Sequence, residues 1–449
     1  MNAHFLPRTI ALAIACLAPA SAAWATDLLQ VYRDAVANDP VIASARSQLQ
    51  ANQEKIIQGR SGLLPAVNLS GNYNKSEIDG STSTSPTPIN RNVTTNGYSV
   101  ALTQPLFRWA NWETFEQSKL VQAQAEATYA QAQIDLITRV SQAYFDVLNA
   151  QDTLTVQEAQ IKAIGEQLAQ AKRNFEVGTS TIVDVNDAQA RYDLAIATQI
   201  AAQNDLQVKR NALLQIIGKE PGNLASLKNG VAIQAPTPAR MDDWTQIAEK
   251  QNYSVVQQQF GYEIAKRTTT INKAGHYPTV DFVASRGRTN SEGSTQLQVA
   301  GNSTSNINTT QYGIQVAIPL FAGFATQSKV RESLALEDKS LADLDNVRRT
   351  AVQSTRQAFL GVNNGLAQVR ALEASERSSQ TALESNQLGF QVGVKISIDV
   401  LNSQQQLFTT RRDLAKARYD ALMNGLKLKA AAGVLKEDDL AEVNTLLDK

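Results

Sequence analysis

The sequence predicts a mainly helical protein with a few strands that cross a membrane, built from two internal repeats. Three observations predict this fold class. Motifs recur in the two halves, proline is absent from two stretches long enough for very long helices, and segments of alternating polarity precede those stretches. The predicted organisation is a first repeat at 26–221, a linker at 222–240, a second repeat at 241–435 and a C-terminal tail at 436–449.

The repeat is visible as four short motifs that recur about 214 residues further along the chain. "LLPAVNL" matches "HYPTVDF", and "TQPLF" matches "AIPLF". The paired positions are Pro65 and Pro278, Pro105 and Pro319, Asp184 and Asp399, and Gly218 and Gly433. An almost constant offset over a whole half indicates one structural unit that is written twice. The Pro- and Gly-rich stretch 222–240 links the two units.

Long helices are predicted in both halves, because proline is absent from 106–220 and again from 320 to the end of the sequence. Apolar residues recur at steps of three and four, with Ala and Gln between them, which is typical of closely packed, coiled-coil-like helices. The predicted helices are Asp27–Gly62, Trp109–Val177, Val183–Ile217 and Phe324–Val392. The two long ones would each measure roughly 100 Å, and the others about half of that. We therefore expect shorter helices to be stacked end to end beside each long one.

Two hairpins are predicted at 66–105 and 279–319, where apolar and polar residues alternate with the period of a strand. In the first hairpin, Val67, Leu69 and Tyr73 alternate with Asn and Ser. Strands of about 10 residues, the length of a tilted membrane strand, are expected, joined by long polar loops at 76–96 and 289–310.

Four strands cannot close a membrane barrel, so several chains must pool them. Three chains would supply about twelve strands, and closure by itself does not exclude a dimer. Trp109, Trp112 and Phe324 follow the strands and suit an aromatic girdle at the membrane surface. A small soluble hairpin that caps a helical bundle is the alternative interpretation of the same alternation.

Composition excludes several classes of protein. Lys+Arg and Asp+Glu both number 42, so no excess charge points to nucleic acid. Residues 1–25 have the charge, apolar run and Ala-x-Ala end of a secretory signal peptide. Cys16, the only cysteine, lies in that run, and a lipidated Cys16 is the alternative. Because the mature chain would have no thiol and one histidine, we expect no metal, no cofactor and no enzymatic activity.

This order of elements, with a "VGxxxxxDV" turn after each long helix, resembles the TolC family of outer-membrane efflux and secretion channels over essentially the whole mature chain. The resemblance implies a homotrimer with a twelve-stranded β-barrel in the outer membrane and a long α-barrel in the periplasm. The linker and the tail would form an equatorial belt. It also implies an exit duct for a tripartite efflux pump or a type I secretion system. Such a duct receives its cargo from an inner-membrane transporter through a periplasmic adaptor (membrane fusion) protein.

The repeated turn places an aspartate at the start of each returning helix. Asp184 and Asp399 follow the glycines by the same spacing, and Thr181-x-x-Asp184 also fits a capping box, so helix capping is the alternative role for Asp184. In the second turn Ile396 holds the cap position, and Ser397 would have to cap instead. In a trimer each aspartate would form a ring of three, which favours cations.

The resemblance extends to single residues of this periplasmic gate. It assigns Asp399 to a first acidic ring and Asn402 to the place of a second, here neutral, and it leaves open whether Asp187 compensates. The links that close the family's channel would pair Asp184 with Phe390 and Lys395 with Val183. Neither link can form here, because Phe390 has no hydroxyl and Val183 has no acceptor. A direct pair between Asp184 and Lys395 is our hypothesis for a substitute.

The outermost residues of the two turns are small and mostly apolar, and the resemblance makes them docking points for the adaptor. These residues are Val177, Gly178, Thr179, Val392, Gly393 and Val394. Ordinary glycine C-caps with neutral flanks are the alternative interpretation.

Two other functions compete with the channel. A trimeric coiled-coil structural or adhesin protein of the cell surface would also use long Ala/Gln helices, but it does not require the duplicated hairpins. A simple porin would have no use for the helices. The sequence does not identify the cargo.

Overall fold

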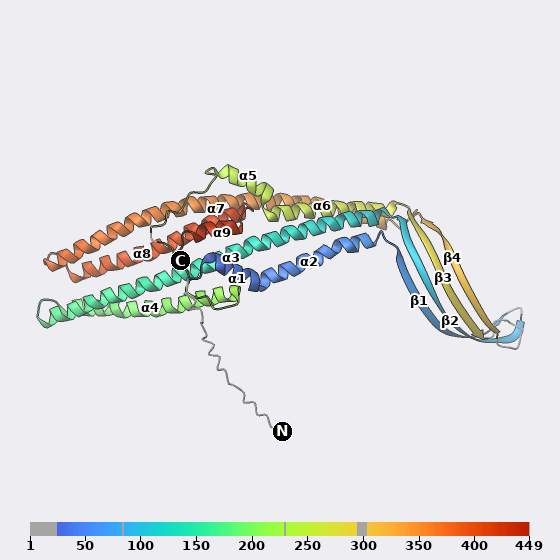
Figure 1. The fold of residues 1–449 in the computed structure, drawn as a ribbon, viewed down its shortest axis with the longest axis horizontal. Helices are drawn as coiled ribbons and strands as arrows, with labels where there is room; N and C mark the ends of the chain where they lie inside the picture. Colours follow the sequence, from blue (N-terminus) through green and yellow to red (C-terminus); the bar gives the residue numbers. More distant parts are fainter. Residues whose placement is uncertain (1–24, 83–84, 229, 294–302, 449) are drawn as a thin grey trace, which may run out of the picture.

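In the computed structural model the chain is an elongated molecule, with helices over most of its length and one sheet at the far end (Figure 1). The structure describes residues 25–82, 85–228, 230–293 and 303–448. The predicted signal peptide and Cys16 lie outside these residues, apart from Ala25. The helices are α1 Leu28–Asn38, α2 Pro40–Ser61, α3 Trp109–Glu176, α4 Ile182–Ile217, α5 Met241–Gln251, α6 Tyr253–Lys273, α7 Ala325–Gln391, α8 Ser397–Ala431 and α9 Glu437–Asn444, with a short 3₁₀ turn at Ala274–His276. The strands are β1 Ala66–Thr82, β2 Ser85–Phe107, β3 Thr279–Gly293 and β4 Ser303–Ala317.

The two long helices have the predicted extent. Helix α3 has 68 residues and α7 has 67, and each of their ends lies within one residue of the prediction. Helices α4 and α8 return beside them (Figure 1). The predicted stacking is also present. The side chain of Asn38 at the end of α1 donates to the carbonyl of Ile217 at the end of α4, and Asn252 before α6 donates to Ala431 at the end of α8.

The prediction of one continuous helix over Asp27–Gly62 is wrong, because the chain breaks at Asp39. A residue before proline is pushed out of the helical region, and Asp39 is extended with ψ 118°. Its carboxylate then caps α2 by accepting from the amide of Val41 at 2.9 Å and also pairs with Arg139. Asn252 makes the corresponding break between α5 and α6 without a proline.

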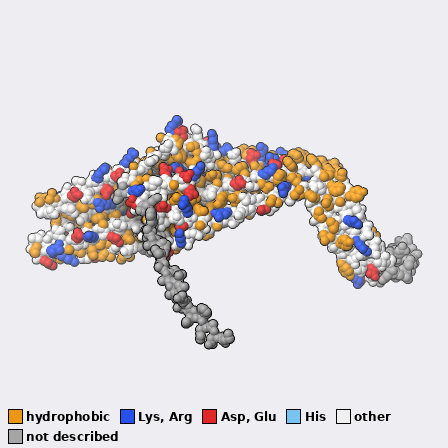
Figure 2. All heavy atoms as spheres, in the orientation of Figure 1, with side chains coloured by type: hydrophobic (Ala, Val, Ile, Leu, Met, Phe, Trp, Pro, Cys, Tyr) orange, Lys and Arg blue, Asp and Glu red, His pale blue; other side chains and the backbone are white. Residues whose placement is uncertain are grey.

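The sheet has the order β1-β2-β3-β4, and all its neighbours are antiparallel. The predicted face is confirmed, since Val67 lies opposite Leu102 and Leu69 opposite Val100. Hydrophobic side chains gather over the part of the sheet next to the helices (Figure 2). The predicted strand length of about 10 residues is wrong, because the strands have 15 to 23 residues.

The polar stretches that were predicted as loops continue the ladder. Ser76 pairs with Val93 and Asp79 with Asn90. Strand pairing uses backbone groups, so polar side chains do not end it. Part of the second stretch, 294–302, lies outside the described residues.

The start of the described chain, the linker and the C-terminal tail meet near the middle of the molecule (Figure 1). Thr26 forms a bridge with Leu224, and Leu227 forms one with Leu447. The tail contains α9, and the side chain of Asn444 accepts from the amide of Leu28 at 3.1 Å. The predicted linker and tail are therefore packed against the long helices and carry part of the main core.

That core surrounds two aromatic rings of α3. Tyr144 is fully buried and donates from its hydroxyl to the carbonyl of Ala225 at 2.8 Å, which ties the linker to α3. Phe145 packs against Tyr419 of α8 with ring centroids 5.8 Å apart, and the Tyr419 hydroxyl donates to Asp152 at 2.6 Å. The first half of the helical region is thereby joined to α8 of the second half.

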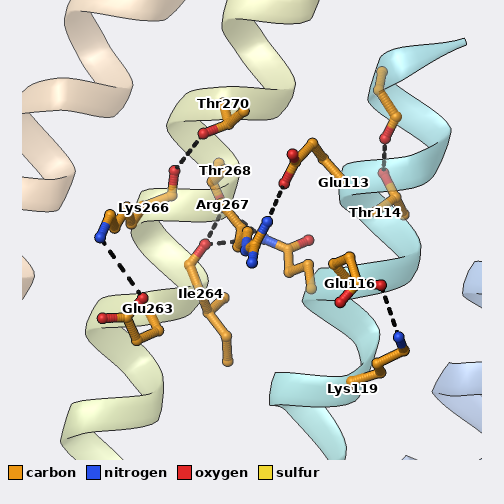
Figure 3. A network of polar contacts seen from close by, with 12 residues as sticks. Glu113, Thr114, Glu116, Lys119, Glu263, Ile264, Lys266, Arg267, Thr268 and Thr270 are labelled. Atoms are coloured by element: carbon orange, nitrogen blue, oxygen red, sulfur yellow. Dashed lines mark hydrogen bonds and ion pairs between the residues drawn. The ribbon is translucent and has the colours of Figure 1, made fainter.

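Ion pairs fix the sheet and its neighbouring helices. Arg108, directly before α3, donates from Nε and Nη2 to the two oxygens of Asp281 in β3, at 2.8 and 2.6 Å. Further along, Arg267 of α6 points across to Glu113 of α3 at 2.7 Å (Figure 3). In the part of the chain that the structure describes, none of the helices combines the length and the apolarity that crossing a membrane requires.

Candidate functional site at the helical hairpin ends

The two helical hairpins, α3–α4 and α7–α8, end on the same side of the molecule, opposite the sheet (Figure 1). In each turn a glycine follows the last helical residues in the left-handed conformation, with φ 77° at Gly178 and 79° at Gly393. Their amides donate to the carbonyls of Phe175 and Phe390, which closes the helix C-termini. The turn therefore requires glycine at both positions, as the repeated motif predicts.

The outermost side chains of the turns are apolar and exposed. Val177 is 72% exposed, Val392 65% and Val394 76%. The amide and hydroxyl of Thr179 both donate to the carbonyl of Asn174, so this side chain completes the turn itself. Small apolar groups held on a rigid hairpin end provide a surface that another protein can cover.

The predicted capping box at Asp184 is confirmed. The hydroxyl of Thr181 accepts from the amide of Asp184 at 3.3 Å, and the Asp184 carboxylate accepts from the amide of Thr181 at 3.0 Å. The hydroxyls of Thr181 and Ser180 donate to the same carboxylate oxygen at 2.8 Å each. These bonds, of which the one from the Thr181 amide is the largest cause, lower the pKa of Asp184 below its ordinary range.

Asp399 has a different environment, although it occupies the matching position. Ile396 precedes its helix and provides no side-chain cap. The suggestion that Ser397 caps in its place is wrong: this residue lies inside α8, and its buried hydroxyl has no hydrogen-bond partner among the described residues. Asp399 is half-exposed, and its nearest cation is the Lys395 ammonium at 3.6 Å. The repeat has thus kept the aspartate without the cap.

The proposed pair between Asp184 and Lys395 does not form within the described chain, because both groups have nearer partners. The side chain of Lys395 packs against Gly389, where an added Cβ would lie 2.8 Å from the Lys395 Cγ. Phe390 packs into the cluster of Leu383, Val400 and Leu407 between α7 and α8. It supports the turn as an apolar residue, in keeping with its lack of a hydroxyl.

The hairpins are joined just above the turns by α8. Leu401 packs among Leu168, Ala171 and Ala188 of the first hairpin. Arg191 of α4 donates to the side-chain oxygen of Asn402 at 2.8 Å. Asp187 is half-buried and forms no hydrogen bond or ion pair within the described ranges.

Sequence reasoning missed Arg191, which binds Asn402, the residue at the position predicted for a second ring. Its partner is a neutral amide, so the usual signal of opposite charges was absent. The structure therefore brings Asn402 to Arg191 and Asp399 to Lys395, and it keeps Asp184 in its own turn.

Comparison with known proteins covers nearly the whole chain. A family model described as outer membrane efflux protein matches residues 31–219 and again residues 244–434. The outer membrane protein TolC of Vibrio cholerae serotype O1 is 31% identical over 439 residues, which cover 98% of this chain and 97% of that protein. The proteases secretion protein PrtF of Dickeya chrysanthemi is 29% identical over 430 residues, which cover 94% of this chain and 91% of that protein. The crystal structure of the outer membrane protein VceC from Vibrio cholerae superimposes with a TM-score of 0.76 at 18% identity. The match covers 90% of this chain and 96% of VceC.

Proposed function

Because the chain belongs to the outer membrane efflux protein family, we propose that it is the outer-membrane exit duct of an efflux pump or a type I secretion system. It is a channel protein and not an enzyme, and its helices extend from the outer membrane into the periplasm. The name of PrtF refers to the secretion of proteases, which favours exported proteins among the cargoes. The neighbouring adaptor and transporter genes, or an adaptor that co-purifies, would distinguish protein export from drug efflux.

The observation that carries the assembly is the sheet, which no single chain can seal. Among the residues that the structure describes, β1 pairs only with β2 and β4 only with β3, so both edges of this sheet are open. One face exposes large apolar side chains, including Leu69 at 74% and Tyr312 at 78%. In a membrane every backbone group needs a partner, so β1 of one chain must pair with β4 of the next. A homotrimer of a two-repeat protomer then closes a barrel of about twelve strands.

The same threefold axis gathers the hairpin ends into the periplasmic mouth. Three copies of Asp399 about 8 Å apart would repel one another by about 2 kcal/mol per pair at an effective dielectric constant of about 20. The mouth would therefore attract cations. We propose that Asp399 and Lys395 set this charge, and that Asp184 serves mainly as a cap. Asn402 and Arg191 leave no second acidic ring at that level, and Asp187 is the only other carboxylate proposed for it.

The exposed turns are the proposed docking points for the periplasmic adaptor, which connects the duct to an inner-membrane transporter. The valines of the two turns would insert into an apolar surface of the adaptor, and the glycines would hold the turns in shape. Photo-crosslinkers at Val177 and Val394 should capture the adaptor in cells. A crosslinker at the exposed Asp338, in the first quarter of α7 and far from the turns, should not.

Single-channel recording in a planar bilayer tests the gate directly. The wild-type protein should form a small, cation-selective pore. Asp399→Asn should lower the selectivity for cations, because it removes three carboxylates from the mouth and leaves the three Lys395 ammonium groups unpaired there. Asp338→Asn is the matched control and should leave selectivity unchanged. A water-soluble monomer without a pore contradicts the assembly, and an unchanged selectivity of Asp399→Asn contradicts the ring alone.

A further inference from the structure

Two arginines lie on the apolar face of the sheet. The pairing register places Arg286 opposite Val100, and Arg288 opposite Tyr98. Residues directly opposite each other share a face, so both arginines belong to the face that carries Leu69, Leu102 and Phe282. Both side chains are exposed. An arginine on the lipid-facing side of a barrel is costly at the middle of the bilayer and tolerated near its surfaces.

The position of these arginines along the strands fits the outer surface of the membrane. At the helical end, exposed Phe107, Trp109 and Phe321 mark one aromatic boundary. Tyr98 lies nine residues before Phe107, which is about 30 Å along a strand and about 23 Å along the membrane normal at the usual tilt. This agrees with the apolar band of about 25 Å that membrane barrels have. Tyr98, directly opposite Arg288, is the exposed aromatic side chain at this second boundary.

The local charge at this level is positive. Arg286 forms no ion pair or hydrogen bond within the described residues, and Arg288 donates only from Nε, to Asn290 at 3.2 Å. Lys75, further out on the same face, is already paired with Glu77 at 2.9 Å. The nearest carboxylate on the face is that of Glu292, four residues beyond Arg288, or about 13 Å along the strand. The guanidinium of Arg286 and the two Nη groups of Arg288 are therefore free to bind an anion.

We propose that Arg286 and Arg288 form a binding site for the phosphate groups of a phosphorylated glycolipid in the outer leaflet, of the lipid A class. A guanidinium presents parallel donors that match phosphate oxygens, and the apolar side chains below would pack against the acyl chains. Tyr98, opposite Arg288, supplies a hydroxyl at the headgroup level. This site rests on the proposed membrane insertion, but the channel does not depend on it. Three such sites surround the trimer and tie the duct to the outer leaflet.

The test is lipid binding by the purified full-length protein in detergent, measured by native mass spectrometry. The three probes are diphosphorylated lipid A, the same lipid without phosphates, and inorganic phosphate. Wild-type protein should prefer the diphosphorylated lipid. Arg286→Gln with Arg288→Gln should weaken that binding by at least about tenfold. Arg286→Lys with Arg288→Lys keeps the charge but loses the parallel donors, so it should bind at a level between the wild type and the double Gln variant.

The matched control is Arg348→Gln with Arg349→Gln, an exposed pair on α7 in the helical region, which should bind lipid as wild type does. Unchanged lipid binding in the double Gln variant of β3 overturns the site, as does equal binding of the dephosphorylated lipid. Binding of inorganic phosphate as tight as that of the lipid overturns the lipid as the ligand. Conductance is recorded for every variant. If the wild type forms pores but shows no lipid preference, this site fails and the channel stands.

Discussion

The capping box at Asp184 gives a prediction whose size follows from the structure. One carboxylate oxygen of Asp184 accepts three hydrogen bonds, from the amide and hydroxyl of Thr181 and the hydroxyl of Ser180. Asp184→Ala removes all three, but the hydroxyl of Thr181 can still accept from the amide of residue 184, so the variant loses the N3 half of the capping box. Loss of the hydrogen bond from the Thr181 amide, together with the negative charge at the helix N-terminus, typically costs about 1 kcal/mol. The opening equilibrium constant of this turn should therefore rise roughly fivefold.

The pH dependence has a definite sign. The folded pKa of Asp184 is lowered below its ordinary value, so its carboxylate form is favoured in the native state. The stabilisation is present above the ordinary pKa of the carboxyl group and is lost as pH falls through the lowered folded pKa. The difference between wild type and Asp184→Ala should accordingly be largest at neutral pH and should shrink in acid.

Hydrogen exchange of the peptide covering 178–190 measures this opening in the assembled protein. Asp399→Ala is the matched control, because the same substitution at the equivalent position removes no cap. We expect faster exchange at the first turn of α4 in Asp184→Ala and little change at the first turn of α8 in Asp399→Ala. Equal effects at the two turns would refute the division of roles between the aspartates.

Two further substitutions test the helical region. Tyr419→Phe removes the hydroxyl that donates to the Asp152 carboxylate. Burial raises the pKa of Asp152, and the hydrogen bond from Tyr419 lowers it in part. Because the folded pKa is raised, the cost of burying the ionised carboxylate appears as pH rises. We expect Tyr419→Phe to lose about 1.5–3 kcal/mol of stability at neutral pH and less in acid, measured as a lower temperature of heat inactivation. An equal loss of stability at both pH values would contradict this reasoning. Gly393→Ala places a side chain at φ 79°, which costs about 1–2 kcal/mol although an added Cβ meets no atom within 4 Å. The control Gly425→Ala has equal room in a helix interior and should be neutral or stabilising, so equal losses in the two variants would point to crowding instead of backbone conformation.

The long helices could be predicted to within one residue because their signals are local. Missing proline permits them, and the left-handed glycine ends them. The strands were underestimated because their outer parts are polar, and only a neighbouring strand makes such a segment extended. The break at Asp39 was missed because the apolar spacing continues across it, although Pro40 disfavours a helical conformation of the residue before it. The role of the C-terminal tail could not be predicted either. The side chain of Asn444 accepts a hydrogen bond from the amide of Leu28, which is more than four hundred residues away in sequence.

At the hairpin ends, residue types were predicted better than partners. Thr181 and Asp184 are three residues apart, so their reciprocal bonds can be read from spacing alone. Lys395 and Asp399 are four apart, an ordinary helical pair spacing, but the comparison of the two turns drew attention to Asp184 instead. The bond between Arg191 and Asn402 joins two hairpins, and it depends on tertiary packing such as that of Leu401 against α3 and α4.

The contact between Lys395 and Asp399 decides how the proposed gate should respond. An exposed ion pair of this kind contributes less than about 1 kcal/mol within one chain. Repulsion among three carboxylates at the mouth would reach about 2 kcal/mol per pair, so the lysine gains more from neutralising that ring than from moving to Asp184, whose carboxylate is already satisfied. Removal of the lysine should then act through Asp399. We therefore expect Lys395→Ala to change single-channel conductance in the wild-type background and to add nothing in Asp399→Asn. An undiminished effect of Lys395→Ala in Asp399→Asn would instead support a lock that joins Lys395 to Asp184 of a neighbouring chain.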